Sequence, residues 1–305
     1  MTSYLFLIIG LITLVLGGDF LVRAAISITK KMNVSPLLIG VTVVSFGTSL
    51  PELLVSLQAA IDGNSGVVIG NVIGSNIANI GLVLGITALI SPMVFQRKNY
   101  IFSWVFMFLS ALVFIWVSID FNLSYYEGLI LVFLLLIFIL LSIKFSKLEI
   151  DSIDKESVIS LPLTLLYFLL GSTGLYYGSE MLVENAVVIA KEWGVSELII
   201  GITVIALGTS LPELVTSIIA VIKGYNSISI GNLIGSNVFN VLAVIGITSS
   251  IKSITVDSSV LSFDFPVMLG FTLFMGLILL GSKVSRVQGL VLLLGYLSYI
   301  IFSFT

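Results

Sequence analysis

Cysteine and histidine are both absent from the 305-residue chain. The chain therefore has no disulfide or thiolate chemistry, and the lack of imidazole disfavours zincins and most serine hydrolases. Charged residues are also scarce, at 10%, whereas soluble domains carry roughly 25%. The formal net charge of −3 is too small to indicate a nucleic-acid partner. These absences argue against a soluble enzyme and against a nucleic-acid-binding protein.

Hydrophobic residues, by contrast, make up 58% of the chain. Apolar runs of about twenty residues recur along it, each long enough to cross a hydrocarbon core of about 30 Å. The first run has no Lys or Arg before it, so it lacks the basic region of a cleavable signal peptide and is predicted to be a membrane helix. The sequence thus predicts an all-α polytopic membrane protein. Ten transmembrane helices are expected, near residues 4–31, 35–62, 66–90, 99–119, 125–145, 158–191, 196–223, 227–251, 260–281 and 285–303.

The chain also repeats itself. Shifted by 161 residues, the first half aligns with the second without a gap, and 26 of the 48 positions from Gly40 to Thr87 are identical to their partners. A unit with an odd number of spans must insert upside down the second time, so the halves are predicted to be inverted repeats. The predicted organisation is a five-helix repeat over 1–145, a short cytoplasmic linker over 146–157 (SKLEIDSIDKES) and a second, inverted five-helix repeat over 158–305.

The basic residues fit this topology. With the N-terminus outside, ten of them lie at the predicted inner connections and two at the outer ones, which satisfies the positive-inside rule. Both termini are therefore expected outside the plasma (inner) membrane. The inner residues are Lys30, Lys31, Arg97, Lys98, Lys144, Lys147, Lys155, Lys223, Lys283 and Arg286, and the outer ones are Lys191 and Lys252.

The run GTSLPEL occurs twice, at 47–53 and 208–214, and each copy places a glutamate, Glu52 or Glu213, in an apolar stretch. An ionised carboxylate at mid-membrane costs about 2.5–3.5 kcal/mol on insertion scales. A structural carboxylate would pair with Lys or Arg, but no basic residue lies in the cores of the second, third, seventh or eighth predicted helices. The two glutamates are therefore candidates for binding a cation.

Hydroxyl residues surround both glutamates at helical spacings, so most of them share a helix face with the carboxylate. Pro51 and Pro212 lack an N–H, which by this argument frees the backbone carbonyls of Gly47 and Gly208. A set of oxygen ligands suits Ca²⁺, which takes about six to eight oxygens, better than Zn²⁺ or the tightly hydrated Mg²⁺. The hydroxyl residues are Ser45, Thr48, Ser49 and Ser56 in the first half and Thr209, Ser210 and Ser217 in the second.

A second duplicated motif lies in the third and eighth predicted helices, as GNVIGSNIAN (70–79) and GNLIGSNVFN (231–240). Its glycines form small-xxx-small pairs, for which close helix packing is the favoured interpretation. Its polar residues are spaced four apart and line one face, either as interhelical hydrogen-bonding groups or as ligands. The ligand interpretation is favoured for Ser75, Asn79, Ser236 and Asn240, while Asn71 and Asn232 complete the two polar faces.

GTSLPE followed by GNxxGSN, once in each half, resembles the cation/calcium antiporter superfamily, and prokaryotic sodium/calcium exchanger homologues in particular. The resemblance implies ten helices and ion sites clustered at the midplane between the second, third, seventh and eighth. Which backbone carbonyl is freed in each half stays open to within one helical turn. The resemblance points to the carbonyls of Ser45 and Ala206, whereas the proline argument points to those of Gly47 and Gly208. The implied ligands are Glu52, Glu213, Thr48, Ser49, Thr209, Ser210, Ser75, Ser236, Asn79 and Asn240, with the carbonyls of Ser45 and Ala206.

These features predict a secondary active antiporter that exchanges Ca²⁺ for Na⁺ by alternating access. The ions and the lipid bilayer are the expected partners, and neither a cofactor nor an obligate protein partner is expected. Some members of the superfamily carry Asp where this chain has Asn240, and an amide binds no proton, so the counter-ion stays open. A Ca²⁺/H⁺ antiporter is the alternative, and a cation channel, with a pore more naturally built from identical subunits, is a weaker one.

Asp19 and Glu180 are partners under the 161-residue shift, in the first and sixth predicted helices. Both could serve as gate or entry residues. Asp19 also has Arg23 one turn away, which favours a structural ion pair. The two acids are therefore left outside the predicted site.

Overall fold

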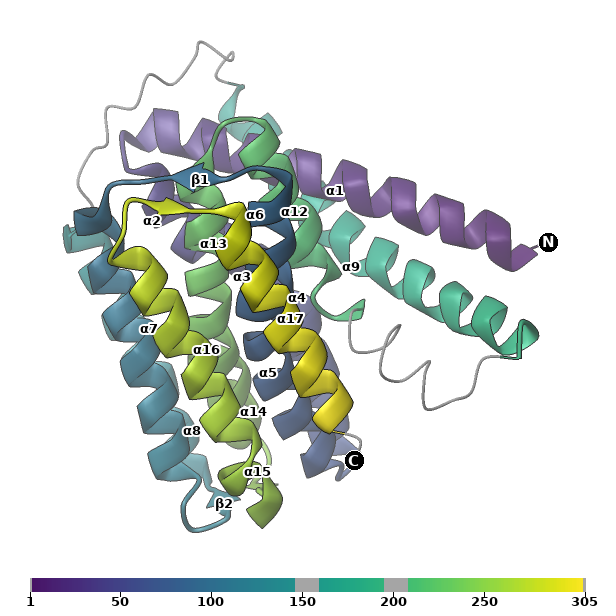
Figure 1. The fold of residues 1–305 in the computed structure, drawn as a ribbon, viewed down its shortest axis with the longest axis vertical. Helices are drawn as coiled ribbons and strands as arrows, with labels where there is room; N and C mark the ends of the chain where they lie inside the picture. Colours follow the sequence, from purple (N-terminus) through teal and green to yellow (C-terminus); the bar gives the residue numbers. More distant parts are fainter. Residues whose placement is uncertain (1, 146–158, 195–207, 304–305) are drawn as a thin grey trace.

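The computed structural model describes residues 2–145, 159–194 and 208–303, and these are almost entirely helical (Figure 1). The first half contains α1 (Thr2–Met32), α2 (Pro36–Ile39), the π-helix η1 (Gly40–Val44), α3 (Ser45–Thr48), α4 (Leu50–Ile61), α5 (Ser65–Ala78), the π-helix η2 (Asn79–Leu84), α6 (Gly85–Ile90), β1 (Met93–Val94), α7 (Arg97–Val117), β2 (Asn122–Leu123) and α8 (Tyr125–Phe145). The second half contains α9 (Leu161–Glu192), α12 (Leu211–Ile222), α13 (Asn226–Phe239), the π-helix η4 (Asn240–Ile245), α14 (Gly246–Ser249), β3 (Ile254–Thr255), α15 (Ser258–Ser262), α16 (Asp264–Leu279), β4 (Lys283–Val284) and α17 (Arg286–Phe302).

Six of the described helices are long and apolar enough to cross a membrane, or seven if the bent pair α2–α3 and α4 counts as one span. Two further apolar helices, α12 and α17, are shorter. The predicted seventh span, 196–223, falls partly on residues 195–207, which lie outside the described residues, as does the predicted linker 146–157. The chain is therefore a multi-pass helical membrane protein, and the count of ten spans stays a prediction.

Both proline-containing motifs leave helical geometry within the described residues, next to the prolines for which the sequence predicted freed carbonyls. Ser49 leaves helical geometry at φ −90°, ψ 3° between α3 and α4, and Ser210 does so at φ −94°, ψ 5° before α12. Each proline then stands in the first turn of the next helix, where a missing N–H removes no helical hydrogen bond. The first break bends the chain by 43°.

The described residues contain three π-helices, which were not predicted from the sequence. Two of them, η2 and η4, begin at Asn79 and Asn240, which the 161-residue shift superimposes. π-Bulges cost regular hydrogen bonding and are frequent at functional sites. Their recurrence at these two asparagines marks the same point in both halves.

The described part of the chain also contains four two-residue strands that were not predicted, and each pairs a connection of one half with a connection of the other. β1 pairs with β4 through Met93↔Val284, and β2 pairs with β3 through Leu123↔Ile254. The 161-residue shift converts the first of these pairings into the second. Figure 1 places β1 at one end of the helical bundle and β2 at the other.

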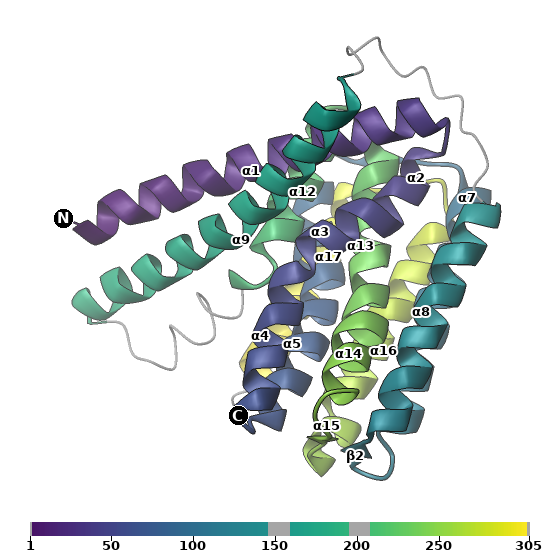
Figure 2. The same ribbon diagram turned by 180° about the vertical axis from the view of Figure 1, so that it is seen from behind.

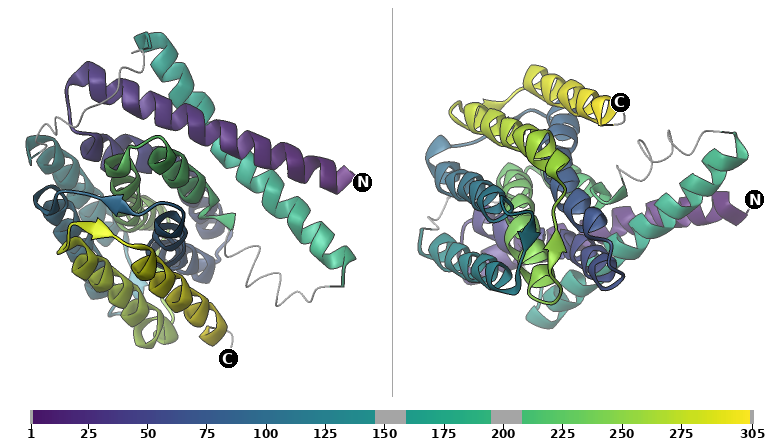
Figure 3. Two further views of the ribbon diagram at one scale, coloured as in Figure 1. Left: turned by 45° about the horizontal axis from the view of Figure 1, so that its top comes forward. Right: turned by 90° about the horizontal axis from the view of Figure 1, so that it is seen from below.

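α1 and α9 run side by side and extend away from the other helices (Figures 1, 2 and 3). Glycines allow this close approach: a Cβ at Gly17 would lie 2.7 Å from the Leu175 nitrogen, and one at Gly178 would lie 2.5 Å from the Leu14 nitrogen. The shift by 161 residues relates Gly17 to Gly178. α1 and α9 thus pack backbone against backbone, with equivalent glycines making the close approach from each helix.

Asp19 in α1 makes the structural ion pair predicted for it. Its Oδ2 lies 2.6 Å from Nε of Arg23, and its Oδ1 lies 3.0 Å from Nζ of Lys223. The second contact, which the sequence did not indicate, ties α1 to the end of α12. Asp19 is therefore engaged as a packing ion pair.

Candidate ion-binding site

The broken helices face α13 inside the bundle, and side chains of the two halves meet there. Thr48, the last residue of α3, donates a hydrogen bond of 3.1 Å to Oδ1 of Asn232. Its hydroxyl also lies 3.2 Å from that of Ser236, which in turn donates to Oε1 of Glu213 over 3.4 Å. Residues 48 and 213, which belong to different repeats, therefore share one polar network.

Both glutamates are buried, Glu52 at 1% exposure and Glu213 at 0%. Each stands in the first turn of a helix, α4 or α12, where the helix dipole favours a negative charge. Through Ser236 and Thr48, Glu213 is linked to the end of α3, one residue before the break that precedes α4 and Glu52. Among the described residues, neither glutamate forms a salt bridge with Lys or Arg, so the structural alternative of a carboxylate–base pair is not observed.

The glutamates retain oxygens with no hydrogen-bond partner among the described residues. Both oxygens of Glu52 and Oε2 of Glu213 are buried in this state. An unsatisfied buried polar group costs about 1–3 kcal/mol, and more when it is charged. Such oxygens are the groups that a bound cation would satisfy.

Five more predicted ligands share this property. The hydroxyls of Ser49, Ser75 and Ser210 and the amide groups of Asn79 and Asn240 are buried without a partner. These side chains come from the two helix breaks, from α5 and from the starts of η2 and η4. Like the glutamates, each of these side chains carries an oxygen that a cation could use.

The remaining predicted ligands are placed differently. Ser45 is buried, but its hydroxyl donates to Thr42 O over 3.2 Å, and its carbonyl accepts the Ser49 N–H at 2.9 Å. Thr48 and Ser236 belong to the network described above, while Thr209 is half-buried in the turn before α12. Ala206 lies outside the described residues.

Two of the predicted hydroxyl residues, Ser56 and Ser217, form hydrogen bonds between helices. Asn71 donates to Ser56 Oγ over 2.9 Å and to the Glu52 carbonyl over 3.1 Å. Asn232 donates to Ser217 Oγ over 3.5 Å, which is the equivalent contact in the other half. Each pair fixes the glutamate helix against the following helix.

Sequence reasoning did not assign a role to Asn76, the last residue of the first GSN motif. Its Nδ2 donates to the carbonyl of Asn237 over 3.4 Å, and Asn237 is its partner under the 161-residue shift. The contact therefore joins equivalent points of the two halves between α5 and α13. The regular spacing of the motif gave no signal that these asparagines would meet.

Within the described residues, no group of three or more His, Cys, Asp or Glu side chains comes together. A cation at the two glutamates would thus be coordinated largely by neutral oxygens. Membrane-length helices around a buried cluster of oxygen-bearing side chains define a multi-pass membrane protein with a candidate cation site.

Comparisons with known proteins identify the family within this class of membrane protein. The family described as sodium/calcium exchanger protein matches residues 2–144 and again residues 163–305. The chain is 31% identical to the sodium/calcium exchanger MaX1 of Methanosarcina acetivorans, over 99% of this chain and 98% of the relative. It is 35% identical to the putative antiporter CaxA of Alkalimonas amylolytica, over 98% of each.

A solved structure agrees with these relatives. The sodium-calcium exchanger NCX_Mj, soaked with 2.5 mM Na⁺ and 0.1 mM Ca²⁺, aligns with a TM-score of 0.83 and 32% identity over 99% of this chain and 98% of that one. The chain belongs to the sodium/calcium exchanger family, within the cation/calcium antiporter superfamily. Its relatives are transporters and not enzymes.

Proposed function

We propose that the chain exchanges Ca²⁺ for Na⁺ across the membrane by alternating access, with the ions bound at a midplane site built on Glu52 and Glu213. The observation that carries this proposal is the set of buried, unpartnered oxygens on these two residues and on their neighbours. Family membership supports the same ions. The transported ions are cargo, and the proposal requires no cofactor.

Charge balance explains how such a site would couple the two ions. The two carboxylates supply −2, which one Ca²⁺ or two Na⁺ would neutralise. Placing Ca²⁺ and several Na⁺ together in a buried pocket would leave uncompensated positive charge, which is costly at low dielectric. The occupancies therefore exclude each other, and exchange follows if the loaded site reorients and the empty one does not.

The ligand set extends beyond the glutamates. We assign Ser49, Ser75, Ser210, Asn79 and Asn240 to it on the strength of their unpartnered polar atoms. Thr48, Ser236 and Thr209 complete the side-chain set, and the carbonyls of Ser45 and Ala206 the backbone set. Of the two carbonyl choices left open by the sequence, Ser45 already accepts the Ser49 N–H, so a cation would use its second lone pair.

The proposed architecture is ten spans in two inverted repeats, 1–145 and 158–305, joined by a cytoplasmic linker, with both termini outside. Three observations support it: the family matches each half at the same offset, the strand pairings exchange under that offset, and so do the glycine contacts of α1 with α9. The pair α1–α9 extends away from the bundle (Figure 3), and we assign it the moving part in alternating access.

Proteoliposomes test the proposal. Calcium uptake driven by an outward sodium gradient, with no proton gradient, is the expected result. Uptake driven only by a proton gradient would show that the counter-ion is the proton and not sodium. Uptake down the calcium gradient alone, at rates far above those of a carrier, would make the protein a channel.

A further inference from the structure

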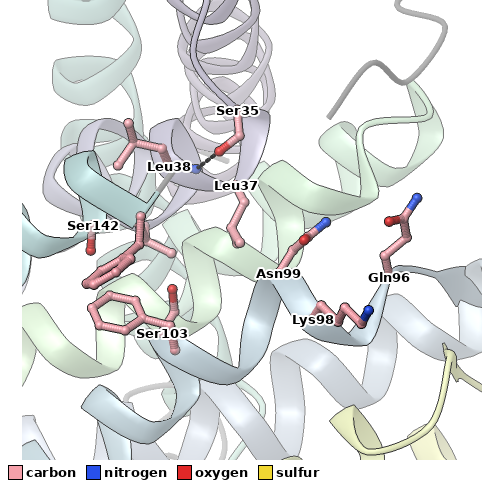
Figure 4. Close-up of a pocket in the computed structure, with 11 residues that line it drawn as sticks. Ser35, Leu37, Leu38, Gln96, Lys98, Asn99, Ser103 and Ser142 are labelled. Carbon is pink, nitrogen blue, oxygen red and sulfur yellow. Dashed lines mark hydrogen bonds between the residues drawn. The ribbon is translucent and has the colours of Figure 1, made fainter. Parts of the chain in front are cut away.

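A cavity lies apart from the candidate ion site, at the end of the bundle that carries Lys98. Its volume is about 400 Å³, within the range of roughly 300–1,000 Å³ typical of small-molecule sites. It is enclosed by α2, η1, the start of α7 and the end of α8 (Figure 4). None of the predicted ion ligands that the structure describes lines it.

One side of this cavity is polar and positive. Lys98 and Gln96 line it at the start of α7, a helix of 21 residues whose N-cap has no side-chain hydrogen bond. The N-terminus of such a helix carries partial positive charge and favours an anion. Among the described lining residues there is no acidic side chain.

The other side combines apolar side chains with the hydroxyls of Ser35, Ser103 and Ser142 (Figure 4). Leu38, Val41 and Phe102 form its wall together with Phe145. Ser142 also lines it, is only 6% exposed, and its hydroxyl has no hydrogen-bond partner among the described residues. A buried, unpartnered hydroxyl beside an apolar wall indicates a ligand with both polar and apolar parts.

We propose that this cavity binds an anionic phospholipid, with the phosphate at Lys98 and the first turn of α7, a headgroup oxygen at Ser142, and the beginning of an acyl chain against Leu38, Val41 and Phe102. Basic pockets between membrane helices at the cytoplasmic face select anionic lipid headgroups. Lys98 lies at the end of the bundle that is expected to face the cytoplasm. Because α2 continues through η1 into α3, a lipid here braces the helix that carries Thr48.

The test titrates the purified full-length protein in detergent with phosphatidylglycerol and counts bound lipids by native mass spectrometry. Lys98→Gln should weaken phosphatidylglycerol binding about fivefold, the effect of roughly one basic residue at a membrane surface. Lys283→Gln is the matched control, because Lys283 pairs with Val94 on the neighbouring strand but does not line the cavity. It should leave binding unchanged.

Two further arms identify the ligand. Phosphatidylcholine, which is zwitterionic, should bind more weakly than phosphatidylglycerol, and free glycerol 3-phosphate should not displace the bound lipid. Displacement by glycerol 3-phosphate would show that the cavity binds a small phosphate ester. Equal binding of the two lipids would show that the net charge of the headgroup does not contribute to binding. Either result overturns the proposal, as does equal loss in the Lys98 and Lys283 variants.

A cavity-filling variant, Ser142→Phe, should abolish the bound lipid altogether. Its thermal unfolding is measured alongside, and if the variant does not fold, the comparison of Lys98→Gln with Lys283→Gln decides alone. The measurement reports lipid binding without ion transport, so its outcome is independent of the exchange activity.

Discussion

Replacing Glu213 by glutamine separates a role in ion binding from a role in the fold. Glutamine has nearly the same shape, and its amide oxygen can still accept the hydrogen bond that Ser236 donates to Oε1 over 3.4 Å. The variant therefore removes one negative charge with little change in packing. Because Glu213 is fully buried, solvent does little to screen the loss.

The magnitude follows from the charge removed. Two unit charges 4 Å apart interact by about 4 kcal/mol at an effective dielectric constant of 20, and a divalent cation doubles this to about 8 kcal/mol. If desolvation offsets more than half of that gain, about 3 kcal/mol remains, which corresponds to a loss of calcium affinity of roughly 100-fold. Glu52→Gln should have a similar effect, because its oxygens have no other partner among the described residues.

Stability should respond in the opposite direction. Without cations, Glu213→Gln replaces a buried acid that has no basic partner among the described residues with a neutral amide, so the thermal unfolding temperature should stay the same or rise. A structural carboxylate would behave otherwise, because removing one partner of a buried ion pair costs about 3–5 kcal/mol.

The assay combines calcium uptake into proteoliposomes with thermal unfolding of the cation-free protein. Asp62→Asn is the matched control, since Asp62 is an exposed carboxylate at the end of α4 and its loss should leave uptake unchanged. Wild-type uptake by the Glu213 variant, or lost stability with retained calcium binding, would refute the reasoning.

Three further substitutions test neighbouring parts of the structure. Asn240→Asp adds a buried carboxylate at the start of η4 and should change the sodium or pH dependence of uptake, whereas an unchanged profile would remove Asn240 from the ligands. Thr48→Val breaks the hydroxyl link to Asn232 and Ser236 and should weaken calcium binding about tenfold, as for a lost hydrogen bond in a buried network; unaltered binding would contradict that link. Gly178→Ala places a methyl group 2.5 Å from the Leu14 nitrogen and should lower stability and slow exchange. The control Gly66→Ala, whose Cβ meets no described atom within 4 Å, should do neither. Equal effects of the two substitutions would show that α1–α9 packing is not the cause.

The features that the sequence predicted well are those set by local chemistry. Pro51 and Pro212 cannot continue a helix, so the breaks at Ser49 and Ser210 followed from residue type alone. Glu52 and Glu213 stood out because charge is rare in apolar segments. Their burial, and their lack of a basic partner among the described residues, follow from the same composition.

The features that it did not predict depend on tertiary contacts. Nothing in the spacing of Asn79 or Asn240 distinguishes a π-helix from an α-helix, because the extra residue is accommodated by neighbouring helices. The strand pairing of Met93 with Val284 joins segments nearly two hundred residues apart in the chain. Lys223 likewise gave no local sign that it would meet Asp19, because the contact depends on how α12 packs on α1.

That last contact also shows where the duplication ends. The 161-residue shift relates Asp19, Arg23 and Lys223 to Glu180, Glu184 and Asp62, so one acid and two bases become three acids. The ion pair of α1 therefore has no counterpart in the second half, although the glutamates, the asparagines and the helix breaks all do. The inverted arrangement proposed above requires this difference: two copies inserted in opposite orientations place equivalent residues on opposite faces, and only the cytoplasmic face is enriched in Lys and Arg. On this proposal, buried oxygens near the midplane can be duplicated because the midplane is the same from both sides, whereas charges at the helix ends must diverge for each copy to keep its orientation.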